Sequence, residues 1–425
     1  MNSTNDYDVL ICGAGVGGLA LAVALGQQGR RVLVIDKRSK ETLVHRGEFL
    51  QPRTLGILQN WGVLSTLRTR GALNIRAMQA SSANGAFMGQ LNYELLPGSF
   101  NYGMVHYYHE TKSALYKEAN SLVEIRDNTQ CVDLRFNSYG EVIGARLLAG
   151  QKEYEVSARL TVAADGRTSQ LRRWMGISAS MYEYPHQLLG LDLEHVSHLE
   201  PVMNAFLSSK GVRVLYPMPG QRARLYVQVE RGELAKIKQQ GMASWREQLL
   251  RDTPALQVIA EQIPDDFAGA QLQGAWNFCS PIWTRPGFAL IGDAAHYVHP
   301  AAGQVMNAAI IDAWTLASEL QAAATGEHLN EREVAQALTA YGGKRPTEFA
   351  YIARLCHRMS LCCATTSPAL RAFLQWCMWL NRGNKRLQYV VTYNMSGLGV
   401  RRFTRRERLY QYGLLPDPNA AVIDF

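Results

Sequence analysis

Three carboxylates stand where apolar runs of the sequence end, and their positions suit ligand binding. Asp36, Asp165 and Asp293 each follow a stretch that is predicted to be a buried strand. Open α/β sheets bind ligands beyond the carboxyl ends of their strands, where a carboxylate accepts hydrogen bonds from ribose hydroxyls. Asp165 by itself would serve equally well as the N-cap of a following helix. Three such acids together favour one composite binding site over three separate caps.

The first acid belongs to a glycine-rich turn, GAGVGG, at residues 13–18. Gly13 permits the tight turn, Gly15 lets a pyrophosphate approach the backbone, and Gly18 lets the next helix pack closely on the strand. The unpaired N–H groups and the positive dipole end of that helix attract phosphate. Asp36 lies 18 residues after Gly18, where its carboxylate meets a ribose. The pattern predicts a dinucleotide site without identifying the dinucleotide.

Strands and helices alternate around this turn. The apolar run 9–11, a helix at 19–27 and a strand at 31–35 form a β-α-β unit. Further helices are predicted at 52–60, 110–122 and 304–323, and short strands fill 123–163. Residues 180–280 alternate between apolar and polar side chains, which indicates an antiparallel sheet, and residues 72–100 do so weakly. From residue 331 the pattern is helical, with helices expected at 334–341, 346–363 and 369–380.

The predicted fold is therefore α/β, and α+β overall. It combines a Rossmann-like dinucleotide-binding domain, an antiparallel-sheet substrate domain and C-terminal helices. The expected division is 1–71, 101–179 and 281–330 for the first domain, 72–100 and 180–280 for the second, and 331–425 for the helical region. With 425 residues the chain is long enough for this arrangement.

Charge and cysteine usage restrict the partners. The net charge of +8 comes mainly from the arginines and lysine between Arg382 and Arg408, so we expect no nucleic-acid partner for the protein as a whole. The seven cysteines are odd in number and irregularly spaced, which predicts free thiols, a cytoplasmic location and no metal site. No apolar run reaches the roughly 20 residues that span a bilayer. The apolar helix at 369–380 either packs on the core or, with the basic residues after it, lies on a membrane surface or a partner.

Four segments together resemble the class A, single-component flavoprotein monooxygenases of the para-hydroxybenzoate hydroxylase type. They are GAGVGGLALAVAL with Asp36, then RGEFLQPRTLGIL, AADGRTSQLRR, and GDAAHYVHPAAGQVMNAAIIDAWTLASEL. The order and the spacing match over residues 1–350. The resemblance implies that the dinucleotide is FAD, and that NAD(P)H visits without a domain of its own.

The resemblance also assigns roles to residues. It implies that Asp36 holds the adenosine ribose, that Arg46 contacts the flavin and pyrophosphate region, and that Asp293 binds the ribityl chain. Asp165 and Gly166 match a motif linked to both FAD and the pyridine nucleotide. The full set of expected cofactor contacts is Gly13, Gly15, Gly18, Asp36, Lys37, Arg46, Gln51, Lys112, Asp165, Gly166, Asp293, Pro300, Gly303, Val305, Met306 and Asn307.

Two positions depart from the family pattern. The family has G-x-G where this chain has Gly303-Gln304-Val305, so Val305 adds a branched side chain beneath the expected flavin position. The family's Arg or Gln beside the flavin is not evident around residues 108–112, where either His109 or Lys112 takes its place or the contact is missing. Val305 leaves open whether oxygen reaches a reduced flavin in the usual way.

The resemblance implies a reaction in which NAD(P)H reduces FAD, O₂ adds at flavin C4a, and the resulting hydroperoxide transfers one oxygen atom. The expected substrate is a small hydrophobic molecule, aromatic or polyketide-derived, as in secondary metabolism, and the expected assembly is a monomer or homodimer. His296 and His109 are the candidate bases, although a histidine near a strand end is often structural. Alternatives are a flavoprotein reductase or redox-neutral cyclase, a non-catalytic FAD-binding scaffold and a flavin-dependent halogenase; the tryptophan motif of halogenases is missing from the sequence.

Overall fold

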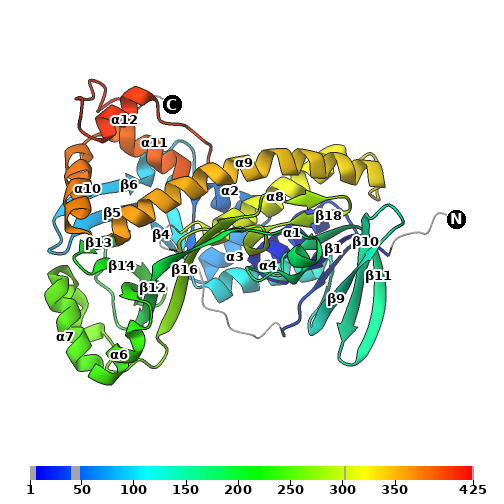
Figure 1. The fold of residues 1–425 in the computed structure, drawn as a ribbon, viewed down its shortest axis with the longest axis horizontal. Helices are drawn as coiled ribbons and strands as arrows, with labels where there is room; N and C mark the ends of the chain where they lie inside the picture. The colour runs from blue at the N-terminus through cyan, green and yellow to red at the C-terminus, as the bar shows by residue number, and fades with distance from the viewer. Residues whose placement is uncertain (1–5, 40–47, 301–302, 424–425) are drawn as a thin grey trace.

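The computed structural model describes residues 6–39, 48–300 and 303–423. Figure 1 shows two sheets side by side, with one long helix, α9, running across both. The first sheet contains the glycine turn, the second lies toward the opposite end of the molecule, and further helices gather beyond the second sheet. Mixed α/β architecture with C-terminal helices is thereby confirmed.

The first sheet is parallel at its centre, and its central strands are buried, as is usual for parallel strands. Its order is β17-β18-β11-β1-β2-β8, and Val9, Leu10 and Ile11 of β1 are wholly buried. Helix α1 covers one face and packs against α4 and α8. The bounds are β1 Tyr7–Cys12, α1 Val16–Gln27, β2 Val32–Ile35, α4 Tyr108–Leu122, β8 Glu124–Arg126, β9 Thr129–Phe136, β10 Val142–Ala149, β11 Lys152–Ala163, α5 Gln170–Trp174, β17 Thr284–Arg285, β18 Phe288–Leu290 and α8 Val305–Ala323.

The second sheet is mainly antiparallel, with the order β19-β16-β12-β15-β14-β13-β5-β6. Its bounds are β5 Ala77–Ser82, β6 Phe87–Asn92, β12 Met181–Leu193, β13 Val202–Ser208, β14 Gly211–Met218, β15 Arg222–Glu230, β16 Gln271–Cys279 and β19 His296–Tyr297. Strand β19 belongs to this sheet although it follows β18 of the first sheet closely. The segment around Asp293 therefore joins the two sheets.

Smaller elements fill the space around the sheets. A three-stranded sheet has the order β3-β7-β4, and helices α6 and α7 cover part of the second sheet. The bounds are β3 Phe49–Leu50, α2 Pro52–Asn60, α3 Val63–Thr69, β4 Leu73–Ile75, η1 Tyr93–Leu95, β7 Gly103–Val105, α6 Glu233–Gln240, α7 Met242–Asp252, η2 Pro254–Gln262 and η3 Gly292–Ala294. The division into domains stays a prediction, since strand pairing groups these residues without fixing domain boundaries.

The C-terminal region differs from the sequence prediction at one point. A single helix, α9, runs over Glu331–Ala364, where two helices interrupted near Pro346 were expected. Proline removes one backbone donor, but α9 is braced along its length by α8, β11, β14 and β16. Helices α10 (Pro368–Asn381), α11 (Lys385–Met395) and α12 (Arg405–Gln411) complete the chain. No helix in these described ranges is long and apolar enough to cross a membrane.

Candidate functional site

A cavity of about 700 Å³ extends from the glycine turn to the face of the second sheet. At one end it is lined by the turn, β2, α4 and the loop after β11. At the other end it is lined by β12 to β16. The cavity is thus lined by residues of both sheets. It offers a polar end and a mainly apolar end to one elongated ligand.

Glycine is present at the three positions of the turn for different structural reasons. A Cβ on Gly13, whose φ is +122°, would lie 2.3 Å from the Ala164 carbonyl oxygen, and one on Gly18 would lie 1.9 Å from the Gly13 oxygen. Both are required for close backbone packing. A Cβ on Gly15, in contrast, would meet no described atom within 4 Å, and Gly15 lines the cavity. The open space lies at the N-terminus of α1, as a bound pyrophosphate requires.

Asp36 fixes the turn from the end of β2. One carboxylate oxygen accepts a hydrogen bond from the Ala14 N–H at 2.9 Å, and the other accepts one from the Arg38 N–H at 2.9 Å. Lys37, Arg38 and Lys112 line the same end of the cavity. Burial lowers the pKa of the Lys112 ammonium, although nearby Asp36 opposes the change. This end combines N–H donors and cations, which suits a diphosphate.

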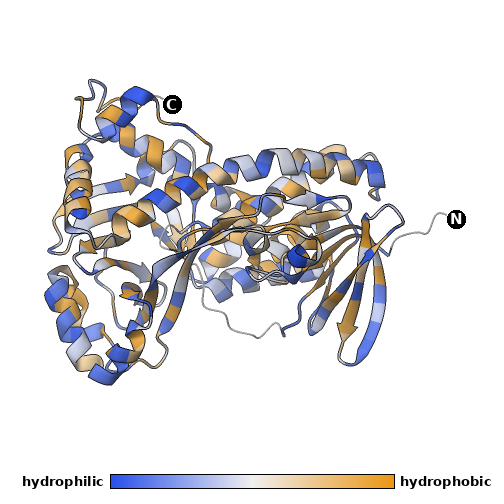
Figure 2. Ribbon diagram, viewed as in Figure 1, coloured by the Kyte–Doolittle hydropathy of each residue, from blue (hydrophilic) through white to orange (hydrophobic). Residues whose placement is uncertain are grey.

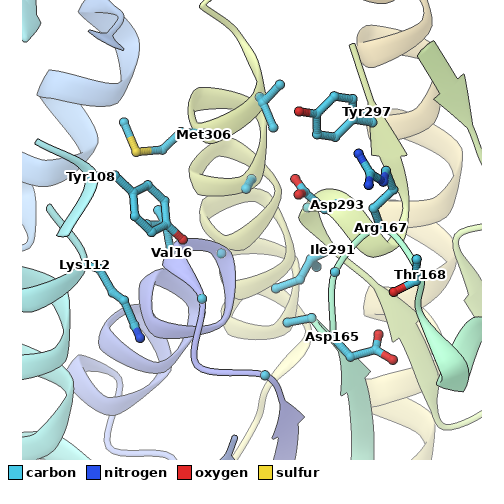
Figure 3. A pocket seen from close by; sticks show the side chains of 18 of the residues that line it. Val16, Tyr108, Lys112, Asp165, Arg167, Thr168, Ile291, Asp293, Tyr297 and Met306 are labelled. Atoms are coloured by element: carbon cyan, nitrogen blue, oxygen red, sulfur yellow. The ribbon is translucent and has the colours of Figure 1, made fainter. Parts of the chain in front are cut away.

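The other two acids lie across the cavity from α4. Figure 3 shows Tyr108 and Lys112 on one side, and Asp165 and Asp293 on the other. One Asp165 oxygen accepts from the Gln170 N–H at 2.8 Å, as a helix-capping carboxylate does, while the helix N-cap itself is Ser169. The second Asp165 oxygen is buried and accepts no hydrogen bond from the described residues. All three strand-end acids therefore line a single cavity, and Asp165 retains acceptor capacity for a ligand.

The start of α8 forms the wall between the two ends of the cavity. Pro300, Gly303, Val305 and Met306 line it, and Gly166 does so from the loop after β11. No acidic residue occupies the first turn of α8, so the positive end of its dipole is not offset there.

Asn307 and Gln51 occupy different positions from those expected for cofactor contacts. Both are buried and neither is among the described residues that line the cavity. The Asn307 amide accepts from the Gln51 N–H at 2.7 Å and donates to the Phe49 and Gly303 carbonyls. Asn307 thus ties β3 to the start of α8. The side-chain oxygen of Gln51 accepts from the Tyr93 hydroxyl at 3.0 Å. Gln51 therefore belongs to the same hydrogen-bond network that holds β3 against the start of α8.

His296 is built into a buried ionic cluster, which argues against its expected role as a base. Its Nε2 lies 2.6 Å from an Asp312 oxygen, and its ring stacks on Phe349. Burial alone would raise the pKa of Asp312, but His296 and Arg345 hold it below its usual value. Asp312 also accepts from the Gly292 N–H at 2.8 Å, which fixes the segment that carries Asp293. His296 therefore positions the site and does not line the cavity.

His109 lies outside the cavity as well. Its half-exposed ring stacks on Tyr107, and its Nε2 lies 3.6 Å from Glu110. Lys112, one turn further along α4, lines the cavity. Of the two side chains expected to replace the family's flavin-side Arg or Gln, only Lys112 lines the cavity. Arg46 lies outside the described residues.

The mainly apolar end of the cavity contains a buried ion pair that the sequence did not reveal. The Arg224 Nη2 donates to Glu48 Oε1 at 2.6 Å, and the Arg224 Nε donates to Oε2 at 3.2 Å. The Tyr216 hydroxyl also donates to Oε2, at 2.7 Å. Both charged side chains are at least 95% buried. Burial raises the pKa of Tyr216 well above its usual value, and the Glu48 charge adds to this effect.

Strand register explains where this ion pair lies. Tyr216 on β14 is the direct partner of Arg224 on β15, and Tyr226 points to the same face as Arg224. Tyr216, Tyr226 and Glu48 line the cavity. Their neighbours there are mainly apolar: Phe49, Leu188, Met203, Val214 and Leu272. Because Glu48 neutralises Arg224, this end of the cavity presents hydroxyl groups and apolar surface without a net charge from the pair.

Comparison with known proteins places this geometry in a family. Residues 6–345 match the model of the FAD binding domain family. The chain belongs to this family. Among curated relatives, ubiquinone hydroxylase UbiL of Rhodospirillum rubrum is 30% identical over 350 residues, covering 74% of this chain and 72% of its own length. Squalene epoxidase erg1 of Schizosaccharomyces pombe is 25% identical over 373 residues, covering 81% and 75%.

The solved structures give the same result for the fold. The structure of PqsL from Pseudomonas aeruginosa in complex with 2-aminobenzoylacetate superimposes with a TM-score of 0.75, at 24% identity, over 86% of this chain and 99% of that chain. The predicted membership of the class A FAD-dependent monooxygenases is confirmed, and the protein is an oxidoreductase of this class.

Proposed function

We propose that the protein uses NAD(P)H, O₂ and bound FAD to hydroxylate or epoxidise a neutral, hydrophobic small molecule, aromatic or polyketide-derived, as in secondary metabolism. The observation that carries this proposal is the single cavity that joins the glycine turn to the apolar face of the second sheet. Such a cavity has room for a dinucleotide at one end and a substrate at the other. A non-catalytic FAD-binding scaffold would not need a second, apolar pocket beside the cofactor.

The residues at the polar end fit FAD. Gly15 leaves space at the N-terminus of α1, and Lys112 supplies positive charge. One oxygen of Asp165 has no hydrogen-bond donor among the described residues and can accept one from the cofactor. When bound, FAD accepts electrons from NAD(P)H and activates O₂ for transfer of one oxygen atom to the substrate, the other leaving as water. Asp36 and Asp293 would hold the ribose and ribityl hydroxyls, and the dipole of α8 would stabilise negative charge on the ring.

The substrate end supports the choice of a neutral substrate. An unpaired arginine on this face would bind a carboxylate, since guanidinium and carboxylate groups form bidentate pairs. Glu48 already occupies Arg224 in that way. The Tyr226 hydroxyl remains to orient a substrate oxygen, since the Tyr216 hydroxyl already donates to Glu48, and the surrounding apolar side chains exclude water.

Val305 favours one alternative, a flavin-dependent reductase or redox-neutral cyclase. It lines the cavity where the family pattern has glycine. With FAD bound, its methyl groups would take up space through which oxygen could approach the ring. Uptake of O₂ in proportion to NAD(P)H oxidation, increasing when substrate is added, supports a monooxygenase. NAD(P)H oxidation that reduces the organic substrate without O₂ uptake would favour the reductase.

We further propose that the enzyme works in the cytoplasm. The seven cysteines support this, because all are free. Burial raises the pKa of several of these thiols, including Cys279 and Cys356, which keeps them protonated and unreactive.

A further inference from the structure

Helix α10 exposes an unusual number of large apolar side chains. Five of them are between 40% and 50% exposed: Leu370, Phe373, Trp376, Trp379 and Leu380. Only Cys377 of this helix is buried. Figure 2 shows hydrophobic residues along α10 at the outer edge of the molecule. A helix that packed only on the protein core would bury these side chains, so this surface requires another explanation.

The apolar surface continues onto the segment that ends α12. Phe373 stacks on Tyr412, with ring centroids 6.4 Å apart. Gly413 packs so closely beneath Leu380 and Trp376 that an added Cβ would lie 2.4 Å from a Leu380 methyl group. Leu414 and Leu415 follow and are exposed. We call this continuous surface the C-terminal face: Leu370, Phe373, Trp376, Trp379, Leu380, Tyr412, Leu414 and Leu415.

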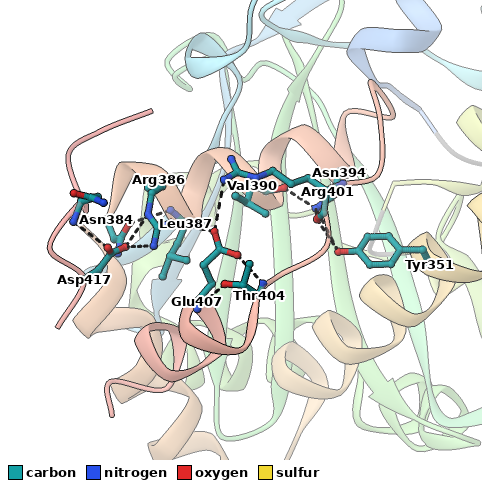
Figure 4. Close-up of polar contacts among 11 residues, drawn as sticks. Tyr351, Asn384, Arg386, Leu387, Val390, Asn394, Arg401, Thr404, Glu407 and Asp417 are labelled. Atoms are coloured by element: carbon teal, nitrogen blue, oxygen red, sulfur yellow. Dashed lines mark hydrogen bonds and ion pairs between the residues drawn. The ribbon is translucent and has the colours of Figure 1, made fainter. Parts of the chain in front are cut away.

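Cations lie beside the C-terminal face and on the neighbouring α12, and the two acids of the described segment are held in ion pairs. Between residues 368 and 423 the only acids are Glu407 and Asp417. Both are held by Arg386, with N–O distances of 3.1 Å and 2.9 Å, and their side chains are at most 4% exposed (Figure 4). Within the described residues of this segment, no acid is therefore left to offset the outward-facing cations.

The positions of the arginines suit contact with a negatively charged surface. The Arg382 guanidinium stacks over the Trp379 ring at 4.1 Å, so it stands at the edge of the apolar face. Arg402, Arg405 and Arg406 are exposed on and just before α12. Exposed tryptophans beside arginines are typical of segments that lie at the boundary between lipid headgroups and acyl chains.

From this arrangement we propose that the C-terminal face docks onto an anionic lipid surface. Trp376, Trp379 and Phe373 enter the boundary region, and the arginines contact the headgroups. A second copy of the chain is a poorer occupant, because a symmetric contact would bring two sets of uncompensated arginines together. The chemistry of the face thus selects a negatively charged, partly apolar surface.

The face also lies next to the substrate end of the cavity. Met378 of α10 packs on an apolar cluster that contains Met203, Val214 and Tyr216, and these three line the cavity. This second step rests on the proposed function. If the substrate is hydrophobic, docking keeps the substrate end close to the phase in which that substrate dissolves.

Flotation of the full-length holoenzyme with lipid vesicles tests the docking. We expect binding to vesicles that contain phosphatidylglycerol, little binding to pure phosphatidylcholine, and weakening by salt. Arg405→Glu with Arg406→Glu should lower the affinity roughly thirtyfold or more, since each basic residue contributes about fivefold. Trp376→Ser with Trp379→Ser should also release the protein. The matched controls, Arg332→Glu on α9 and Val258→Ser on η2, are exposed elsewhere and should bind as the wild type does.

Two results would overturn the docking proposal. One is equal, weak binding of the wild type to all vesicles. The other is a wild-type dimer in sedimentation that becomes monomeric in the Trp376→Ser, Trp379→Ser variant, because the face would then be a contact between copies. Flotation needs no turnover, so a protein that floats but consumes no O₂ contradicts the proposed function and leaves the docking intact.

Discussion

Replacement of Glu48 by glutamine should change both the stability and the ligand preference of the enzyme. The substitution keeps the shape of the side chain and removes its charge. Arg224 would then be a buried cation without a counter-ion, since it is 2% exposed and its ion pair is with Glu48. Breaking one side of a buried ion pair costs about 3–5 kcal/mol, so we expect a loss of this size in the free energy of unfolding.

The same change should allow a carboxylate to bind. A carboxylate ligand in the substrate end would restore the partner of Arg224 through charge-assisted hydrogen bonds, which contribute about 1.5–3 kcal/mol each. One such bond corresponds to a gain of about tenfold to 100-fold in affinity. The wild type should show the opposite preference, because Glu48 repels an anion and already pairs with the arginine.

The assay titrates FAD-loaded protein with benzoate and with benzamide and follows the flavin absorption spectrum. The wild type should prefer benzamide, and Glu48→Gln should prefer benzoate and be stabilised by it against thermal unfolding. Tyr216→Phe is the matched control, since it removes one hydrogen bond to Glu48 and keeps the charge pair. If Glu48→Gln unfolds with the wild-type free energy and gains no preference for benzoate, the argument about a neutralised arginine is wrong.

Three further predictions concern the cofactor end and the protein's pH response. Gly15→Val should abolish FAD binding with little loss of stability, while Gly13→Val should destabilise the fold, which FAD titration and urea unfolding distinguish. Val305→Gly should speed reoxidation by O₂ in stopped flow, and an unchanged rate would remove any special role for this side chain. Burial lowers the pKa of His299 to about 3, so only the unfolded chain takes up its proton below the usual value of 6.5. Stability should therefore fall as the pH drops from 6.5 toward 3, and urea unfolding of His299→Phe should show a shallower fall.

The polar end of the site could be predicted because it depends on local sequence. The spacing of Gly13, Gly15 and Gly18 is set within one turn, and the acids mark strand ends that an apolar run reveals. The three acids converge because parallel strands share one carboxyl edge. Of the two roles that the sequence left open for Asp165, the structure shows the cap, since one oxygen accepts from backbone N–H groups. The other oxygen has no partner among the described residues, and its ligand-binding role stays a prediction.

The substrate end could not be predicted, because it depends on contacts between distant segments. Glu48 and Arg224 are separated by 176 residues and meet only through the packing of β3 on the second sheet. The place of His296 after a strand predicts a base, but the residue lies in a buried cluster with Asp312 and Arg345, which come from two different helices. Proline 346 was expected to end a helix, and the packing of α9 on both sheets outweighs that local preference.

The most direct test of the account is the position of FAD in a crystal structure of the reconstituted protein. The account predicts one FAD per chain, with its pyrophosphate against Gly15 at the start of α1. Asp36 should lie beside the adenosine ribose, Asp293 beside the ribityl chain, and the ring next to Val305. FAD bound elsewhere, or reconstituted crystals whose cavity holds no FAD, would contradict the claim that this single cavity is the active site.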